Sequence, residues 1–176
     1  MLPDGALLEA REINCWRGDR HILRDVSFGV HAGEFLKLTG PNGVGKTTLI
    51  RIVCGLLPPE NGTVLWRGKR VSSSNDEYHI EMAYLGHLNS LKADLTAREN
   101  LRFLAGLRNT LSDADIDGAL DRVGILSRGD LVARSWSAGQ KRRLALARLL
   151  LSGAALWILD EPVTNLDTAG IELVEE

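Results

Sequence analysis

Gly40-Pro41-Asn42-Gly43-Val44-Gly45-Lys46-Thr47, followed by Thr48, is the stretch that decides the fold. Its Gly-x-x-x-x-Gly-Lys-Thr spacing is typical of a loop whose backbone curls around a phosphate chain with several N–H groups turned inward. A Cβ atom at Gly45 would block that approach. The loop therefore predicts a polyphosphate site, in which Lys46 reaches the β- and γ-phosphates and Thr47 offers its hydroxyl to Mg²⁺.

The residues on both sides of this loop fit a strand–loop–helix unit. Residues 34–38, Glu-Phe-Leu-Lys-Leu, predict a buried strand before the loop. Residues 48–54 predict a helix after it, which Gly55 ends. The N-terminal end of such a helix carries a partial positive charge, which favours bound phosphate.

The composition is that of an ordinary globular protein. The chain has 176 residues, of which 44% are hydrophobic and 25% are charged, enough for one domain with a core. The formal net charge of -2 gives no overall basic surface, so nucleic acid is not an expected partner. No stretch approaches the roughly 18 apolar residues of a membrane span, and we therefore expect no direct span. If the protein works at a membrane, another chain must anchor it.

Short alternating segments predict an antiparallel β layer. Residues 7–15 and 24–30 have apolar residues at alternate positions, and residues 63–68 predict a further strand. Trp16 lies in a polar turn between the first two segments. Its ring either stacks on a purine or packs in the ordinary way, and the sequence leaves both open.

The middle of the chain changes to helical signals after a short predicted strand at residues 82–85. Between residues 96 and 123, two capping boxes are formed by Thr96 with Glu99 and by Ser112 with Asp115. They predict a helical lobe inserted in the core, at about residues 88–135. The helix over residues 141–150 is expected to place apolar residues on one face and arginines on the other.

Residues 154–159, Ala-Ala-Leu-Trp-Ile-Leu, predict a strand buried on both faces of a parallel sheet. The strand ends in Asp160 and Glu161. Acidic residues at the carboxyl end of such a strand face the crevice where open α/β sheets bind ligands. Two carboxylates there repel each other unless a cation or a separation of roles relieves them.

The loop at 40–47, the segment Ser137-Ala138-Gly139-Gln140 and the strand ending at Asp160 and Glu161 together resemble the ATP-binding cassette of ABC transporters, over residues 7–167. The resemblance implies an α/β fold of the P-loop NTPase class. Its parts would be a RecA-like core with a parallel sheet, an antiparallel β layer and the inserted helical lobe, in one domain over residues 1–176.

The resemblance also implies a role for each matching residue. Asp160 would act on Mg²⁺ with Thr47, and Glu161 would be the general base that polarises the water attacking ATP. Asp167 would lie in a loop that crosses the interface with a second, head-to-tail copy, and Trp16 would stack on adenine. Further nucleotide contacts are expected from Gly40, Pro41, Asn42, Gly43, Val44, Gly45, Lys46 and Thr48.

The segment 137–140 would complete the nucleotide site of that second copy through Ser137, Ala138, Gly139 and Gln140. Ser137 and Gln140 also form an ordinary helix cap, and both roles can hold at once because a capped helix end is an anion site. Ala138 stands where glycine is usual, and Trp136 begins the segment, which are mild variations.

His87 stands where most cassettes carry a glutamine that senses Mg²⁺ and the membrane partner. Its imidazole can hydrogen-bond a water, but a protonated ring would oppose Mg²⁺ binding. A purely structural histidine is the alternative, and the residues favour neither.

Five segments resemble more narrowly the ATPase subunit of the haem exporter of cytochrome c biogenesis: residues 64–68, 85–87, 95–101, 137–140 and 155–162. This implies integral membrane permease subunits as partners and a peripheral place on the cytoplasmic face of the inner membrane. The alternatives are the ATPase of another ABC exporter, a soluble cassette ATPase acting on nucleic acid or ribosomes, and a non-hydrolysing binding module.

By the same resemblance, a cassette would continue past Glu176 through another core strand to a histidine that contacts the γ-phosphate. His21, His31 and His79 lie outside that motif. We therefore expect the 176-residue chain to bind ATP with Mg²⁺ but to hydrolyse it poorly, and to leave a sheet edge unpaired.

Overall fold

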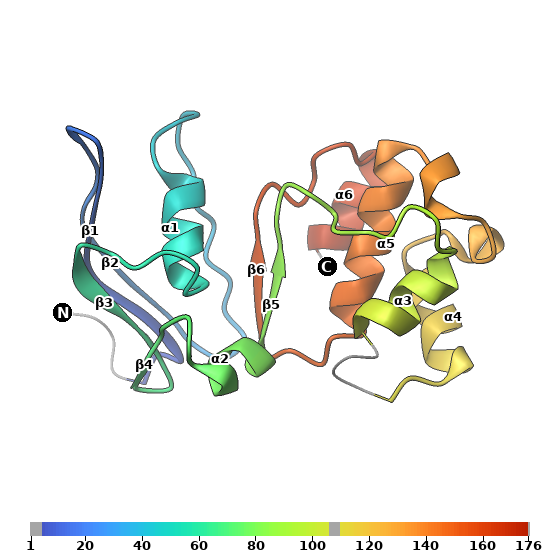
Figure 1. Ribbon diagram of the computed structural model, residues 1–176, viewed down its shortest axis with the longest axis horizontal. Helices are drawn as coiled ribbons and strands as arrows, with labels where there is room; N and C mark the ends of the chain where they lie inside the picture. The colour runs from blue at the N-terminus through green and yellow to red at the C-terminus, as the bar shows by residue number, and fades with distance from the viewer. Residues whose placement is uncertain (1–4, 106–109, 176) are drawn as a thin grey trace. The chain divides into compact units, whose positions relative to one another are not determined.

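The computed structural model describes residues 5–105 and 110–175, which form two compact units that divide between His79 and Ile80. Figure 1 labels the elements of both units. The start of the chain at residues 1–4 and a short piece of the predicted helical stretch, residues 106–109, lie outside the described residues. The predicted single domain with a lobe at 88–135 stays a prediction.

The first unit is built on a four-stranded antiparallel sheet with the strand order β2-β1-β3-β4. Gly18 and Asp19 make the two-residue connection between β1 and β2, with Gly18 at a φ of 56°. The sheet confirms the predicted antiparallel layer. Its strands are β1 at Leu8–Arg17, β2 at Arg20–Val30, β3 at Asn61–Trp66 and β4 at Lys69–Arg70.

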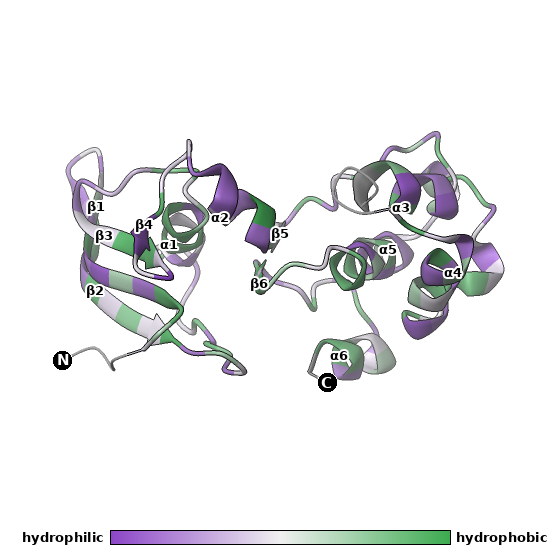
Figure 2. Ribbon diagram, turned by 90° about the horizontal axis from the view of Figure 1, so that it is seen from below, coloured by the Kyte–Doolittle hydropathy of each residue, from purple (hydrophilic) through white to green (hydrophobic). Residues whose placement is uncertain are grey.

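Alternating side chains give this sheet one buried face. In β1 the buried residues are Leu8, Ala10, Ile13 and Cys15. The alternation changes phase at Glu12, whose φ is 51° and where the pairing with β2 shifts register, as in a β-bulge. Figure 2 shows the apolar and polar colours alternating along these strands. The bulge lets both halves of a long strand turn their apolar residues to the same side.

Helix α1, Lys46–Val53, directly follows the phosphate loop. It begins two residues earlier than predicted, and Gly55, with a φ of 73°, ends it as predicted. The Tyr78 hydroxyl of α2, Asp76–Glu81, is fully buried and donates to the Val53 carbonyl oxygen at 2.8 Å. This bond fixes the C-terminal end of α1. The residues that α1 buries are Leu49, Ile50, Ile52 and Val53.

The second unit contains a parallel strand pair with helices between the two strands in the chain. β5, Met82–Leu85, pairs in parallel with β6, Leu156–Leu159. Parallel neighbours need a long crossover connection, which here supplies most of the helices of the unit. These are α3 at Ala97–Ala105, α4 at Asp113–Arg122, 3₁₀ turns at Leu126–Arg128 and Ala133–Ser135, and α5 at Ala138–Leu150, with α6 at Thr168–Glu175 following β6.

One apolar core joins α3, α4, α5 and the strand β5. In Figure 1 the three helices lie together, and β5 and β6 run side by side. The fully buried members of the core include Leu85, Leu101, Ile116, Leu120, Val123 and Leu144. Burial of this apolar surface is what stabilises short helices such as these, because isolated helices of their length are marginal in water.

Local caps fix where the helices begin. The Thr96 hydroxyl accepts from the Glu99 N–H at 3.2 Å, while the Glu99 carboxylate accepts from the Thr96 N–H at 2.8 Å. Ser112 with Asp115 and Ser137 with Gln140 form the same reciprocal pair. All three predicted capping boxes are confirmed.

Buried Asn100 ties the chain before α3 to that helix. Its Nδ2 donates to the carbonyl oxygens of Lys92, Leu95 and Thr96 at 2.9–3.1 Å, and its Oδ1 accepts from the Lys92 N–H at 2.8 Å. The side chain is fully buried. Every hydrogen-bonding atom of this amide is therefore satisfied.

The strand predicted at residues 34–38 is not formed. The segment is extended but belongs to neither sheet, and the Phe35 side chain is 90% exposed. Local hydrogen bonds compete here, because the Glu34 carboxylate accepts from the backbone and ring of His31 at 3.0 and 2.9 Å. These bonds also lower the pKa of Glu34.

The strand predicted at residues 154–159 is shorter, and only partly buried. β6 begins at Leu156, and Trp157 is 45% exposed. The cause is that β6 has one ladder partner, β5, in a two-stranded sheet. Burial on both faces needs layers on both sides of the sheet.

Candidate functional site

The predicted site residues fall into two groups, one in each unit. Trp16 and the residues from Gly40 to Thr48 belong to the first unit, and His87, Ser137 to Gln140, Asp160, Glu161 and Asp167 belong to the second.

The loop Gly40–Thr47 leads directly into the first turn of α1. Gly45 is the N-cap of the helix in a left-handed conformation, with a φ of 111°. The first N–H groups of a helix have no partner within the helix, so they are available to an anion. Thr47 is exposed, and Thr48 is half-buried. The loop therefore presents a hydroxyl and a helix N-terminus to the solvent.

Lys46 spans this loop. Its Nζ donates to the carbonyl oxygens of Gly40 at 2.7 Å and of Pro41 at 3.0 Å. The ammonium group is thereby held against the first residues of the loop, on a side chain that begins at its last turn. A cation in this place is suited to a phosphate chain that enters the loop.

Gly45 is required by packing as well as by conformation. A Cβ atom at this position would lie 2.6 Å from Cγ2 of Ile22 and 3.0 Å from Cδ2 of Leu23, both on β2. The sequence predicted a glycine here for the approach of a phosphate. The structure adds a second reason, since the loop rests directly on the antiparallel sheet.

Trp16 lies near the end of β1 and not in a turn, which corrects the prediction. Its ring stacks on His21 of β2 with the centroids 4.2 Å apart and the planes 4° from parallel. His21 Nε2 lies 2.9 Å from Oδ1 of Asn14, whose Nδ2 donates to Asp25 at 2.8 Å. Trp16 is still 46% exposed. The strand β2 thus carries both the histidine that supports the indole and the Ile22 that supports Gly45.

Asp160 and Glu161 follow β6 and differ in exposure. Asp160 is 7% exposed, and in the described part of the chain its carboxylate accepts no hydrogen bond. Glu161 has a φ of 51°, a left-handed conformation that costs a non-glycine residue about 1–2 kcal/mol. Its side chain is 55% exposed. The strand end therefore holds one buried carboxylate and one that faces the solvent.

His87 follows β5 and meets Glu161. The ring Nδ1 lies 3.7 Å from Oε2 of Glu161, and the His87 side chain is 73% exposed. A histidine packed in the core is therefore not the explanation of this position. Because β5 and β6 are parallel neighbours, their carboxyl ends bring the two residues together.

The burial of Arg142, close to the two carboxylates after β6, is a feature that the sequence did not reveal. The helix α5 was expected to have apolar residues on one face and arginines on the other, but Arg142 is 3% exposed. All five N–H donors of its guanidinium are used. They donate to the carbonyl oxygens of Gly86 at 2.8 Å, Asp160 at 3.0 Å, Glu161 at 2.7 Å and Pro162 at 3.0 Å, and to Oδ1 of Asn89 at 3.1 Å. Burial lowers the pKa of Arg142, while Asp160 and Glu161 act in the opposite direction.

The start of α5 packs against the loop that follows β6. A Cβ atom at Gly139 would lie 2.6 Å from the Asn165 carbonyl oxygen, so a glycine is needed for this approach. Ala138 is exposed, which explains why a methyl group is tolerated there. The Ser137 hydroxyl accepts from the Gln140 N–H at 3.2 Å, so the predicted helix cap is present.

Asp167 caps α6 and binds α5. Its Oδ1 accepts from the Gly170 N–H at 3.0 Å and from Nη2 of Arg143. The bond from Arg143 is the main cause of a lowered pKa of Asp167. Asp167 therefore shapes its own loop.

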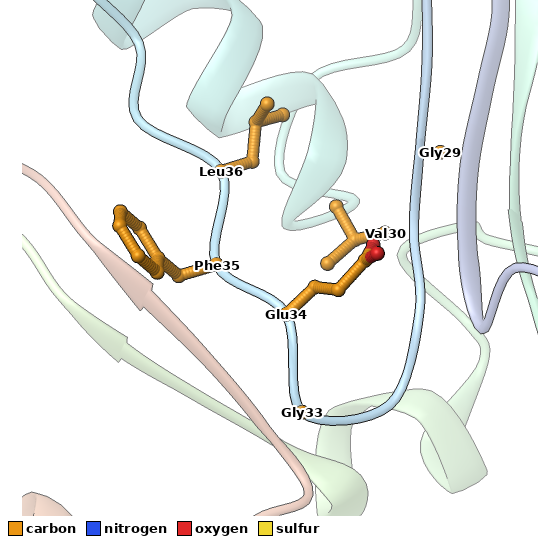
Figure 3. A pocket seen from close by; sticks show the side chains of 6 residues that line it. All are labelled: Gly29, Val30, Gly33, Glu34, Phe35 and Leu36. Carbon is orange, nitrogen blue, oxygen red and sulfur yellow. The ribbon is translucent and has the colours of Figure 1, made fainter.

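A pocket of about 480 Å³ lies along the segment between β2 and the phosphate loop (Figure 3). It shares no residue with the predicted site. Its single charged group, Glu34, is already bonded to His31. The pocket is lined by Gly29, Val30, Gly33, Glu34, Phe35 and Leu36.

Among residues 5–105 and 110–175, no helix is both long and apolar enough to cross a membrane. In the same residues, no group of three or more His, Cys, Asp or Glu side chains is placed to hold a metal ion.

Comparison with known proteins gave concordant matches. The profile of the ABC transporter family matches residues 23–164. The cytochrome c biogenesis ATP-binding export protein CcmA of Dechloromonas aromatica is 46% identical over 167 residues, which cover 94% of this chain and 82% of that protein. The protein of the same name from Nitrosomonas europaea is 45% identical over 170 residues, covering 96% of this chain and 80% of that protein.

A solved structure gives the same answer for the fold. A putative ABC transporter ATP-binding protein from Pyrococcus furiosus has a TM-score of 0.85 at 25% identity, covering 96% of this chain and 82% of that one. The predicted α/β cassette fold, with an antiparallel layer and a parallel pair, is confirmed. A profile match over most of the chain, and relatives at this identity over nearly all of it, show that this protein belongs to the ABC transporter family.

Proposed function

We propose that this chain is the ATPase subunit of an ABC exporter that serves cytochrome c biogenesis, with haem as its cargo. The observation that carries the proposal is the 46% identity, over 94% of the chain, to a protein named as the ATP-binding export protein of that process. The phosphate loop and the two carboxylates after β6 supply the groups that ATP hydrolysis requires.

In this proposal the first unit binds ATP. Lys46 leaves the carbonyl oxygens of Gly40 and Pro41 to contact the β- and γ-phosphates, and the backbone of the loop from Gly40 to Thr48 surrounds them. Trp16 stacks on adenine, which its 46% exposure permits. His21 holds the indole from its other side.

The oxygen groups of Thr47 and Asp160 suit Mg²⁺, which prefers hard oxygen ligands. The support in this structure is Asp160 itself, a residue that is 7% exposed and whose carboxylate accepts no hydrogen bond within the described residues. A buried carboxylate of this kind is costly unless a cation or donors compensate it. Bound Mg²⁺ would neutralise charge on the phosphates.

Glu161 is proposed as the general base. Its side chain faces solvent at the end of β6, where it can hold and polarise a water that attacks the γ-phosphate. His87, whose Nδ1 lies 3.7 Å from this carboxylate, would hydrogen-bond the same water. This is the position where other cassettes use a glutamine.

The segment Ser137 to Gln140 is proposed to complete the nucleotide site of a second, head-to-tail copy. The capped helix start is exposed at Ser137 and Ala138, as such a contact requires. ATP contacts both copies in this arrangement and favours the closed dimer, and hydrolysis removes that preference. Integral membrane permease subunits would hold the dimer on the cytoplasmic face of the inner membrane and transmit the change.

The proposal is tested in cells that lack the gene for this chain. Haem staining measures covalent c-type cytochromes, and ATP turnover is measured on the transporter purified from membranes. We expect the native gene to restore both, and the same gene carrying Lys46→Ala or Glu161→Gln to restore neither while its product remains in the membrane fraction. Lys69→Ala is the matched control, because Lys69 is an exposed lysine of the first unit that pairs with Glu77.

Two outcomes would contradict the proposal in different ways. Normal c-type cytochromes in the deleted cells would exclude a role in their biogenesis. The alternative that the chain is the ATPase of another exporter would then be favoured. Equal turnover by the native protein and Glu161→Gln would exclude the assigned catalytic carboxylate. Recovery away from membranes, bound to ribosomes or nucleic acid, would favour a soluble cassette ATPase.

A further inference from the structure

The acceptors of Arg142 belong to the two segments that carry His87 and Glu161. Gly86 and Asn89 lie on either side of His87 in the sequence. The other three acceptors are Glu161, the proposed base, and its two neighbours Asp160 and Pro162. Four of the five acceptors are backbone carbonyl oxygens. The guanidinium therefore fixes the path of the main chain on both sides of the proposed reaction, without using either carboxylate.

The backbone of Glu161 needs such a support. Its left-handed conformation is unfavourable for a side chain other than glycine, and such conformations persist where the surroundings impose them. The carboxylate itself has weak partners, Thr164 Oγ1 at 3.4 Å and His87 Nδ1 at 3.7 Å. The direction in which Glu161 points is therefore set mainly by its backbone, which Arg142 holds through the Glu161 carbonyl oxygen at 2.7 Å.

Arg142 lies one turn into α5, the helix that Ser137 caps. The same helix contacts the following loop through Gly139 and Asn165, and through Arg143 and Asp167. A displacement of the start of α5 would therefore act on the residues around Glu161 through a buried cluster of charge-assisted hydrogen bonds.

We propose that Arg142 is the positioning residue that holds Glu161 and His87 in fixed register with the start of α5, so that the proposed base is aligned only when this helix is in place. The inference rests on the proposed function, because it takes Glu161 as the base. Arg142 itself touches neither water nor nucleotide in this role. It acts through the main chain of the two loops.

The test uses Arg142→Lys in the transporter purified from membranes. Lysine keeps the charge, but its three donors sit on one atom and cannot serve both loops as a planar guanidinium does. We expect kcat for ATP to fall at least about tenfold, while KM and the equilibrium affinity for ATP with Mg²⁺ change less than about twofold. A variant that only lost folded protein would lower kcat and the number of binding sites together.

Two further variants guard against a failure to fold and against a general arginine effect. Asn89→Ala removes only the side-chain acceptor, and we expect a smaller loss of kcat, about two- to fivefold, at unchanged affinity. Arg134→Lys is the matched control, since Arg134 is an exposed arginine of the same unit that pairs with Asp94. It should leave kcat unchanged.

Hydrogen exchange gives a readout that does not depend on turnover. In Arg142→Lys, we expect two hydrogen-bonded amides to exchange at least about tenfold faster: that of Asp160, which donates to the Leu85 carbonyl oxygen at 2.8 Å, and that of Thr164, which donates to the Glu161 carbonyl oxygen at 3.2 Å. The amides of α3 and α4 should keep their native rates. Unchanged exchange of both amides, or a kcat within about twofold of the native value, would overturn the proposal. If the native transporter hydrolyses no ATP, the proposed function fails, and exchange alone still decides whether Arg142 holds the two loops.

Discussion

Substitution of Gly45 by alanine tests whether the phosphate loop depends on its contact with β2. The added Cβ atom would lie 2.6 Å from Cγ2 of Ile22 and 3.0 Å from Cδ2 of Leu23. Real Cβ atoms do not approach other atoms so closely, so the loop or the strand must move. The same substitution also places a side chain at a φ of 111°.

The magnitude can be built from two contributions. A left-handed conformation costs alanine about 1–2 kcal/mol, of which the loss of unfolded-state freedom recovers about 0.4–1 kcal/mol. Overpacking against the two side chains adds about 1–3 kcal/mol. Gly45→Ala should therefore destabilise the first unit by about 1–5 kcal/mol.

Gly43→Ala is the matched control within the same loop. Gly43 also has a positive φ, 79°, but no atom lies within 4 Å of the position of an added Cβ. This variant keeps only the conformational cost, about 1 kcal/mol. The difference between the two alanine variants isolates the contact with β2.

Urea unfolding without nucleotide is the appropriate assay, since it separates packing from ligand binding. Tryptophan fluorescence reports on both units, through Trp16 and Trp66 in the first and Trp136 and Trp157 in the second, and the variants being compared differ only in the first unit. In an Ile22→Ala background, Gly45→Ala should cost less than in the native background, because the closest clashing atom is gone while the contact with Leu23 remains. Equal destabilisation by both alanine variants in the native background would refute the packing argument.

Three other substitutions test contacts elsewhere in the chain. Tyr78→Phe should lower the free energy of unfolding by about 1–2 kcal/mol, because the buried Val53 carbonyl loses its donor. Burial also raises the pKa of Tyr78, so above about pH 10, where the tyrosine of the unfolded chain loses its proton first, the native chain should lose up to about 1.4 kcal/mol of unfolding free energy per pH unit. Urea unfolding at several pH values should show a smaller slope in the variant. Gly139→Ala should destabilise the second unit by about 1–3 kcal/mol through the clash with Asn165, whereas Ala138→Gly should change the urea midpoint little. Asn100→Ala should lower the free energy of unfolding by about 2–4 kcal/mol in the same assay. Asn100→Asp should not restore this stability, because a carboxylate cannot donate to the three carbonyl oxygens. A loss below about 0.5 kcal/mol in Asn100→Ala would contradict this prediction.

The elements that the sequence predicted correctly are those determined by neighbouring residues. The phosphate loop depends on glycines within eight residues, and the three capping boxes depend on pairs three residues apart. The strands β1 and β2 are joined by a two-residue turn, so their pairing is also local. Each of these signals is complete within a short window of sequence.

The strand predicted at residues 34–38 shows where this reasoning ends. An apolar run gives a segment the preference for burial, but a strand exists only where a neighbour supplies a hydrogen-bond ladder. Trp157 shows the same limit, because the sequence around it cannot state how many neighbours β6 has. The hydrophobic pattern predicts which side chains a segment could bury. Whether they are buried depends on pairing with neighbouring strands.

Arg142 was invisible for a related reason. A charged residue on a helix is normally assigned to the exposed face, and its burial is possible only because acceptors 18–56 residues away converge on it. Most of those acceptors are main-chain carbonyl oxygens, which every residue has, so no side-chain motif announces them. Sequence motifs therefore find the groups that are expected to touch ATP, such as Lys46 and Glu161, because their chemistry is carried by particular side chains. Arg142, the proposed positioning residue of Glu161, could be found only from the folded backbone. A hydrogen bond to a carbonyl oxygen requires a suitable donor, but it sets no requirement on the type of residue that supplies the oxygen.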